Sequence, residues 1–400
     1  MSPLRCIALL LTAFLAQGCA RASLREAVPA RLAETVEVPG LRGVRVWGDA
    51  GADVNRVLLP SERAAITAKY KARVQAGREP VSHFLALSGG ADDGAFGAGL
   101  LVGWTAHGNR PEFDLVTGIS AGALLAPFAF LGTAYDDKLA AIIQSMGGDN
   151  VYQVNIVSGL LGGPAVADNA PLAVLLAQYI DDRMIRKIAD ERRKGRLLVI
   201  GTTNLDAQRP VFWDMGRIAQ SRHPGAFRLF RQVLLASAAL PGVFPPVHID
   251  VVADGMAFQE AHVDGGPTRQ VFFSPVEFNF QDLDRAAGQR VQRHLWIIRN
   301  GKILPEYLEV PETAAAIATR SLETLTKNQG IGDLIRMYDK ALAEGIDYNL
   351  AAVPVTFSAP RKAPFDHAYM TALYAQGLSL GRNGYRWSKR PPGLPAAAAH

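Results

Sequence analysis

Cysteine is nearly absent from this sequence: its 400 residues include only two, Cys6 and Cys19. Two thiols so close to the N-terminus cannot build the disulfide framework on which small secreted domains depend. Cys6 lies within a segment that we expect to be removed, which leaves a chain with no disulfide. The fold must therefore be stabilised by its hydrophobic core, and a hydrophobic content of 49% is sufficient for one.

Long apolar runs and charge of a single sign are lacking as well. Beyond the first residues no uninterrupted apolar run is long enough to span a bilayer, so any membrane contact is expected to be peripheral. The net charge is only +5, and no motif of nucleic-acid readout lies beside the basic clusters at 192–196 and 382–390. Residues of metal-ligand type do not recur at metal-site spacing. We therefore expect no nucleic-acid partner, no metal and no other cofactor.

The first residues have the order of an export signal. Arg5 precedes an apolar run at 7–16 that is too short to span a bilayer. The segment that ends in Cys19 resembles a bacterial lipoprotein cleavage site. This resemblance implies that residues 1–18 are removed, that Cys19 is lipidated, and that the exported chain is anchored in the cell envelope. Ala20, by the same resemblance, favours the outer membrane. An ordinary signal peptide with an incidental Cys19 is the alternative.

A serine flanked by small residues is the most informative local feature. Ser120 lies between Gly118 and Gly122, directly after an apolar strand expected at 113–117. An abrupt turn from strand to helix holds a serine in a strained conformation and exposes its hydroxyl. The two glycines remove side chains that would clash where strand and helix cross. The pattern predicts a nucleophile elbow at Ser120, and a packed turn without chemistry is the alternative.

A glycine loop lies upstream of this serine. An apolar strand expected at 81–87 leads into Gly89, Gly90 and Ala91, and a helical pattern follows at 95–105. Glycines let successive backbone amides point into one concavity, and the helix adds the positive end of its dipole. Such a loop can hold an oxyanion or a phosphate. A phosphate-binding P-loop is excluded because its lysine is missing, and no dinucleotide-binding glycine pattern fits. A glycine turn used only for close packing remains the alternative.

An aspartate lies at the end of a predicted strand downstream. Two strands expected at 247–253 and 256–263 are joined at Asp254 and Gly255, a pair that favours a tight hairpin turn. Asp264 ends the second strand, and the small residues Gly265 and Gly266 leave its carboxylate uncovered. Asp264 is therefore the candidate base, while an ordinary Asp-Gly turn is the alternative.

These three segments, in this order, resemble the patatin-like phospholipase family, which contains acyl hydrolases that use a serine and an aspartate without a histidine. Residues 198–216 resemble the family's central strand and its following hairpin. Residues 235–246 resemble the helix and proline-rich turn that precede the aspartate strand. The resemblance extends over about 82–300. It implies a three-layer α/β/α fold with a mostly parallel central sheet and a Ser-Asp catalytic dyad.

The resemblance assigns a role to each matching residue. Ser120 aligns with the nucleophile and Asp264 with the aspartate that takes its proton. Gly89, Gly90 and Ala91 align with the loop whose amides form the oxyanion hole. The implied substrate is a phospholipid or another acyl-ester lipid, which a lipid-anchored enzyme would meet at a membrane surface.

Two residues of the glycine loop depart from the family pattern. Ala91 stands where a third glycine is usual, and it can supply its amide if its backbone angle is ordinary. Asp93 stands where a basic residue is frequent, and a carboxylate near a developing oxyanion would oppose it. We therefore expect Asp92 and Asp93 to point outward and cap the helix that begins near Gly94.

Two other functions remain open at this stage. One is a Ser-His-Asp esterase acting on soluble esters, in which His294 or His367 would follow Asp264 in the chain order of α/β-hydrolases. Neither histidine lies in a glycine-bounded loop, because His294 precedes an apolar strand and His367 precedes a helical pattern. The other is a lipid-binding lipoprotein with impaired chemistry, a possibility that Asp93 supports.

Boundaries between the parts of the chain are soft. Residues 19–80 are expected to form a tether and an N-terminal extension, 81–300 the catalytic domain, and 301–390 a largely helical extension packed on the core. The proline- and alanine-rich residues 391–400 are expected to be disordered. The glycine- and leucine-containing segment 155–170 is expected to line an entrance for acyl chains, with a buried loop as the alternative. Nothing in the sequence indicates the oligomeric state.

Overall fold

The computed structural model describes residues 25–49, 58–147, 153–154, 167–274 and 278–394. Both cysteines, and with them the predicted signal segment and lipidation site, lie outside the described residues. Most of the predicted acyl-chain entrance and the last residues of the tail lie outside them too.

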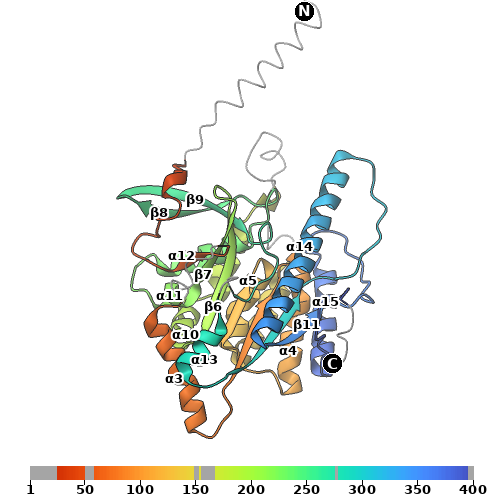
Figure 1. The fold of residues 1–400 in the computed structure, drawn as a ribbon. Helices are drawn as coiled ribbons and strands as arrows, with labels where there is room; N and C mark the ends of the chain where they lie inside the picture. The colour runs from red at the N-terminus through yellow and green to blue at the C-terminus, as the bar shows by residue number, and fades with distance from the viewer. Residues whose placement is uncertain (1–24, 50–57, 148–152, 155–166, 275–277, 395–400) are drawn as a thin grey trace, which may run out of the picture.

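Nine strands of the described chain form one mixed sheet at the centre of the molecule (Figure 1). Its path is β1-β7-β6-β3-β2-β10-β11, and β9 pairs with β6 and carries β8. Neighbours from β6 to β11 along this path run parallel, whereas β1, β7, β8 and β9 are added antiparallel. The strands are β1 (Arg45–Trp47), β2 (Val81–Leu87), β3 (Leu115–Gly118), β6 (Leu197–Asn204), β7 (Arg209–Asp214), β8 (Val247–Ala253), β9 (Met256–Asp264), β10 (Gln292–Arg299) and β11 (Asp347–Ala352). The short strands β4 (Gln153–Val154) and β5 (Ala167–Asp168) pair separately.

Helices cover both faces of this sheet, and a separate hydrophobic core lies between each helical layer and the sheet. One layer contains α4 (Gly94–His107), α5 (Ala121–Leu131), α6 (Asp136–Ser145), α9 (Ala170–Tyr179), α10 (Asp182–Arg193), α11 (Met215–Gln220), α12 (Ala226–Ser237) and α15 (His367–Arg382). The opposite layer contains α3 (Pro60–Gln75), α13 (Phe280–Ala287) and α14 (Ala314–Glu344). Short 3-10 turns occur at η1 (Ala30–Leu32), η2 (Ala91–Asp93) and η3 (Thr133–Tyr135). The predicted α/β fold with a mixed, mostly parallel sheet is confirmed.

The strand and turn predictions rested on local patterns, and several agree with the structure in detail. The apolar segment 81–87 is β2, and β8 and β9 are joined at Asp254 and Gly255. Both turn residues have positive φ, 49° and 75°, as the tightest hairpin turns require. The C-terminal region also contributes a strand, because β11 pairs with β10 at the edge of the sheet.

The sheet brings three chain segments together at the carboxyl ends of its parallel strands. Leu87 at the end of β2 pairs with Gly118 of β3 on one side and with Ile298 of β10 on the other. Because these strands are parallel, the residues that follow each of them emerge at the same edge. Asp264, at the end of β9, pairs with Thr202 of β6 nearby in the same sheet.

Candidate active site

Ser120 occupies the sharp turn between β3 and α5. Its backbone angles are φ 54° and ψ −126°, a conformation that costs a non-glycine residue energy and that clusters at functional sites. A Cβ added to Gly118 would lie 2.5 Å from the Gly122 carbonyl oxygen, and one on Gly122 would lie 2.4 Å from the Leu87 carbonyl oxygen. Both positions therefore need glycine, for the steric reason that the sequence suggested. Ser120 itself remains partly exposed.

The elbow is held from the opposite side by Ser237, the last residue of α12. The Ser120 amide donates to Ser237 Oγ at 3.0 Å, and Ser237 Oγ donates to the Gly201 carbonyl oxygen at 2.7 Å. Ser237 is fully buried, so this bridge is shielded from water. Nothing in the sequence singles out Ser237, because its role depends on a contact between distant segments.

Asp264 is buried beside Ser120, with 2% of its surface exposed. Its Oδ1 accepts a hydrogen bond from the Gly266 amide at 2.7 Å. Its Oδ2 has no partner in hydrogen-bonding geometry among the described residues. Burial raises the pKa of Asp264 to about 6, although the nearby Ser120 hydroxyl and the Gly266 amide lower it. The structure thus brings the two predicted residues together and leaves one carboxylate oxygen unoccupied by the protein.

Glycines are also required next to the carboxylate. A Cβ on Gly265 would lie 2.6 Å from Ile119 Cδ1 and 2.8 Å from the Gly201 carbonyl oxygen. One on Gly266 would lie 3.0 Å from Asp264 Oδ1. The two glycines therefore let Asp264 and the elbow approach each other.

The glycine loop lies directly against the nucleophile, since a Cβ on Gly89 would be 3.2 Å from Ser120 Cβ. The Gly89 amide, however, donates to the Gln270 carbonyl oxygen at 3.0 Å. Within the described residues, the amides of Gly90 and Ala91 have no hydrogen-bond acceptor. The candidate oxyanion hole therefore has two amides, those of Gly90 and Ala91, and not the predicted three, because the Gly89 amide already donates to Gln270.

Ala91 does not have the ordinary backbone angle that the sequence argument assumed. Its φ is 49°, in the left-handed region that favours glycine. The condition of an ordinary backbone angle at Ala91 is therefore not met, and the alanine occupies a position where the family's usual glycine would carry no strain.

Asn300 braces the start of the loop. Its amide donates to Ser88 Oγ and its Nδ2 donates to the Ser88 carbonyl oxygen, both at 2.8 Å. Its Oδ1 accepts from the Gly97 amide of α4 at 3.1 Å. One buried side chain thereby ties the end of β10 to the loop and to the helix that follows. In the sequence, Asn300 marks only the end of the family resemblance.

Asp92 and Asp93 do not cap α4, so that expectation was wrong. No side-chain capping bond forms at Asp93. Asp93 Oδ1 instead accepts from the Tyr369 hydroxyl at 2.6 Å. Asp92, which is 1% exposed, pairs with Arg361 at 2.8 Å and accepts from the Phe365 amide at 3.1 Å. Both carboxylates hold the C-terminal region against the glycine loop.

Burial raises the pKa of both carboxyls, Asp92 and Asp93. It raises the pKa of Asp92, while the Arg361 guanidinium opposes the shift. It raises the pKa of Asp93 to about 6, while the Tyr369 hydroxyl lowers it. A capping role would leave the Asp93 carboxylate exposed to solvent, whereas in the structure it is largely buried beside Tyr369.

The two histidines that could complete a catalytic triad form their contacts away from Ser120 and Asp264. His294 Nδ1 lies 2.9 Å from Asp347 Oδ2, and its ring stacks on His83, well below the edge that carries Ser120. His367 Nε2 lies 3.2 Å from the Gln144 carbonyl oxygen. His294 lies within β10, where the sequence placed it just before the strand.

A further histidine, His262, lies in β9 two residues before Asp264. Its Nδ1 is 2.9 Å from Thr202 Oγ1 and its Nε2 is 3.0 Å from Glu260 Oε2. Burial lowers the pKa of His262, and both ring nitrogens are occupied by these contacts. His262 is thus held in place as part of the core beneath the site.

The described part of the chain contains neither a metal centre nor a membrane-spanning helix. In it, no three His, Cys, Asp or Glu side chains gather in a way that would hold a metal ion. No helix of the described residues is both long and apolar enough to cross a bilayer.

A strained serine, a buried carboxylate beside it and two amides without acceptors among the described residues form a site with the geometry of a serine hydrolase, at the edge of a mixed α/β sheet. Residues 85–277 match the family described as patatin-like phospholipase. This part of the chain is therefore similar to patatin-like phospholipases.

Similar solved structures include VipD from Legionella pneumophila and the human GIVD cytosolic phospholipase A2. VipD is 11% identical over 76% of this chain and 67% of its own, with a TM-score of 0.35. The human enzyme is 11% identical over 87% of this chain and 64% of its own, with a TM-score of 0.34. At this level of similarity neither structure bears on the activity of this chain. No curated protein matches the sequence.

Proposed function

We propose that the protein is a serine acyl hydrolase that cleaves acyl ester bonds of phospholipids or related lipids through Ser120 and Asp264. The observation that carries this proposal is the strained serine beside a buried carboxylate whose Oδ2 has no hydrogen-bond partner among the described residues. The patatin-like phospholipase match over residues 85–277 supports the choice of a lipid ester as substrate.

The reaction would proceed in two halves. Asp264 takes the proton of the Ser120 hydroxyl while Oγ attacks the acyl carbonyl carbon, and the carbonyl oxygen becomes an oxyanion near the amides of Gly90 and Ala91. As the tetrahedral intermediate collapses, the alcohol leaves with the proton from Asp264, and the acyl group stays on Ser120. Water then loses a proton to Asp264 and attacks the acyl-enzyme. Release of the fatty acid returns that proton to Ser120.

Burial of Asp264 makes the dyad workable without a histidine. An aspartate in water is a weak base with a pKa of 3.8, whereas burial raises the pKa of Asp264 to about 6. A base is most effective when its pKa lies near the working pH, because it is then both ionised and basic. At neutral pH Asp264 is still mostly ionised, so it combines the required charge with increased basicity.

The carboxylate of Asp93 is accommodated by neighbours of opposite polarity. The Tyr369 hydroxyl donates to it, and positive charges of Arg361 and Arg299 lie close enough to interact with it. The hydroxyl and the two guanidinium groups reduce the repulsion that a free carboxylate would exert on an oxyanion, whereas Asp92 and Glu306 add negative charge nearby.

The substrate class is tested with phospholipid vesicles and measurement of released fatty acid. We expect the wild type to release fatty acid, Ser120→Ala to release none above background, and the control Ser321→Ala, altered at an exposed serine of α14, to match the wild type. Hydrolysis of soluble esters without any fatty acid release from vesicles would contradict a lipid substrate. Activity retained in Ser120→Ala would contradict the proposed nucleophile.

We also propose that the chain is exported and anchored through lipidated Cys19 to the cell envelope, at the outer membrane. The order of Arg5, the apolar run at 7–16 and Cys19 supports this proposal. Expression of the full chain in a Gram-negative bacterium with radiolabelled palmitate tests it. We expect label in the membrane fraction of the wild type and none in Cys19→Ser, whereas an unlabelled, soluble wild type would contradict the anchor.

A further inference from the structure

Gln270 lies between the two loops that carry the candidate catalytic groups. It follows Asp264 by six residues, and only 5% of its surface is exposed. A Cβ added to Gly89 would lie 3.3 Å from Gln270 Oε1, and one added to Gly266 would lie 2.6 Å from Gln270 Nε2. One buried amide side chain therefore lies against both the glycine loop and the turn that follows the base.

The side chain of Gln270 holds the turn after Asp264. Its Nε2 donates to the Gly266 carbonyl oxygen at 3.1 Å. The amide of the same glycine donates to Asp264 Oδ1 at 2.7 Å. Gly266 is thus fixed through both of its polar backbone groups, one by the base and the other by Gln270. The hydrogen bond that orients the Asp264 carboxylate therefore depends on Gln270.

The backbone of Gln270 holds the glycine loop. Its carbonyl oxygen accepts from the Gly89 amide at 3.0 Å, and Gly89 lies directly against Ser120. The Gln270 amide donates to Asp333 Oδ2 of α14 at 2.7 Å, and Asp333 is 1% exposed. A buried side chain of α14 thus fixes the residue to which the loop beside the nucleophile is bonded.

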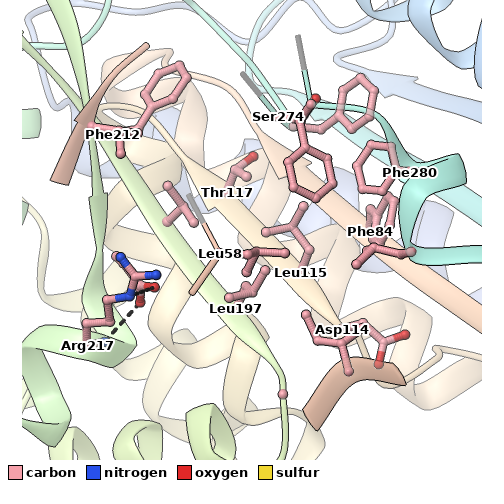
Figure 2. Close-up of a pocket in the computed structure, with 18 of the residues that line it drawn as sticks. Leu58, Phe84, Asp114, Leu115, Thr117, Leu197, Phe212, Arg217, Ser274 and Phe280 are labelled. Atoms are coloured by element: carbon pink, nitrogen blue, oxygen red, sulfur yellow. Dashed lines mark hydrogen bonds and ion pairs between the residues drawn. The ribbon is translucent and has the colours of Figure 1, made fainter. Parts of the chain in front are cut away.

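The segment that carries Gln270 is bonded to the sheet as well. Thr117 Oγ1 of β3 donates to the Phe272 carbonyl oxygen, and Phe273 is buried in the hydrophobic core. Figure 2 labels Thr117 and Ser274 among the side chains that line one pocket. Gln270 is therefore carried by a fixed segment, which is the support that a precisely placed catalytic group requires.

An amide is the chemical group that this position requires. Gln270 Oε1 accepts from Arg299 Nη1 at 3.3 Å while Nε2 donates to Gly266, so both ends of the side chain are used. A glutamate of the same size could accept from Arg299 but, when ionised, could not donate to Gly266. A methionine of similar length could make neither bond.

We propose that Gln270 is a positioning residue for the acyl transfer, because it sets the glycine loop and the Asp264 turn at a fixed distance around Ser120. The inference rests on the function proposed above, in which Asp264 takes the proton of Ser120 and the loop amides bind the oxyanion. Errors in such geometry are costly, since a misplacement of about 1 Å can slow an enzyme about a hundredfold.

The kinetics of Gln270→Met test the inference. With p-nitrophenyl butyrate we expect kcat to fall about 10- to 100-fold. KM should change less than about twofold, because both halves of the reaction use the same base and amides and slow together. Gln220→Met is the matched control, since Gln220 Nε2 donates to the Ala189 carbonyl oxygen at 3.2 Å where α11 contacts α10. This variant should keep the wild-type kcat and KM.

The pH profile separates positioning from a loss of stability. The Gly266 amide lowers the pKa of Asp264. When Gly266 is released, the inflection of kcat/KM should therefore move to higher pH by at least about 0.5. Gln270→Glu, which keeps the acceptor for Arg299 but lacks the donor to Gly266, should show the same fall in kcat and the same shift.

Melting temperatures establish that both variants fold. The inference requires the fall in kcat and the shift of the inflection in each of them. A folded Gln270→Met or Gln270→Glu that keeps the wild-type kcat or the wild-type inflection would overturn it, even if its melting temperature is lower.

Hydrogen exchange tests the inference without requiring catalysis. The peptide that covers residues 264–268 should exchange at least about threefold faster in Gln270→Met than in the wild type, and at the wild-type rate in Gln220→Met. Unchanged exchange in Gln270→Met would overturn the inference. A wild type that hydrolyses no ester would refute the proposed function alone, and the exchange rates would still decide whether Gln270 holds the turn after Asp264.

Discussion

Among single residues, Asp264 shows most clearly how burial creates chemistry. The carboxyl lies at the end of β9 with 2% of its surface exposed, so its charged form has lost most of its hydration. This raises the pKa of Asp264 to about 6. The same burial that improves the base also makes the ionised form costly to the fold. Activity and stability are therefore expected to respond to pH in opposite directions.

The activity should increase with pH through the pKa of Asp264. Below pH of about 6 the base is protonated, so kcat/KM should rise about tenfold per pH unit and then level off above it. The pH profile of short-chain ester hydrolysis measures this. Asp93→Asn is the control, because the pKa of Asp93 is also about 6, and this variant should keep the inflection. If the inflection disappeared in Asp93→Asn, the titrating group would be Asp93 and not Asp264.

The free energy of unfolding should fall as pH rises, opposite to the activity. The folded-state pKa of Asp264 lies above the unfolded value of 3.8, so folding favours the protonated form and stability is lost as pH rises from about 4 to about 6. Asp264→Asn removes this cost and should be more stable than the wild type at pH 8, by on the order of 2–3 kcal/mol. The difference should vanish near pH 4. Urea unfolding at both pH values measures it, and a wild type more stable than the variant at pH 8 would refute the argument.

Ala91 offers a second test at a single position. Its φ of 49° strains an alanine, so Ala91→Gly should leave the free energy of unfolding unchanged or raise it by up to about 1 kcal/mol. The matched control is Ala95→Gly, in the first turn of α4, which should lose about 1 kcal/mol because its backbone is helical. Equal losses in the two variants would show that Ala91 is not strained.

At the scale of elements, α4 and α15 pack at unusually short range. Figure 1 shows the two helices side by side although they lie at opposite ends of the folded chain, and they contact each other extensively. Glycines at the contact allow this approach, because a Cβ on Gly99 would lie 2.1 Å from the Tyr374 carbonyl oxygen. Since α4 follows the glycine loop, its contact with α15 also fixes the position of that loop.

Substitution at this helix contact should therefore be costly. Gly99→Ala forces two backbones apart and should lower the free energy of unfolding by about 2 kcal/mol or more. Gly147→Ala is the control, because a Cβ there meets nothing within 4 Å, and it should be close to neutral. Thermal and urea unfolding of the two variants measure the difference. A tolerated Gly99→Ala would mean that α15 is not held closely against α4.

At the scale of the whole molecule, the predictable features were those encoded in short segments. Apolar runs, glycine positions and the Asp254 turn predicted β2, the elbow and the β8-β9 hairpin because each depends mainly on neighbours in sequence. The roles of Ser237 and Asn300 could not be predicted, since both residues act through contacts with segments more than 100 residues away.

The error at Asp92 and Asp93 has the same origin. A local rule favours acidic residues at the start of a helix, but the partners of these two carboxyls lie about 270 residues downstream. Similarly, β11 interrupts a region whose local pattern is mainly helical because β10 offers it an open edge. Pairing with distant elements overrides local propensity in both cases.

The most direct test of the central claim is fluorophosphonate labelling of the purified chain. We predict that the wild type is labelled, that Ser120→Ala and Asp264→Asn are not, and that Asp254→Asn and the double variant His294→Ala/His367→Ala are labelled like the wild type. Asp254 is a matched control because it precedes a glycine in the same hairpin but lies exposed at its turn. Labelling that survives in Ser120→Ala, or that is lost in the double histidine variant, would contradict a Ser120-Asp264 dyad.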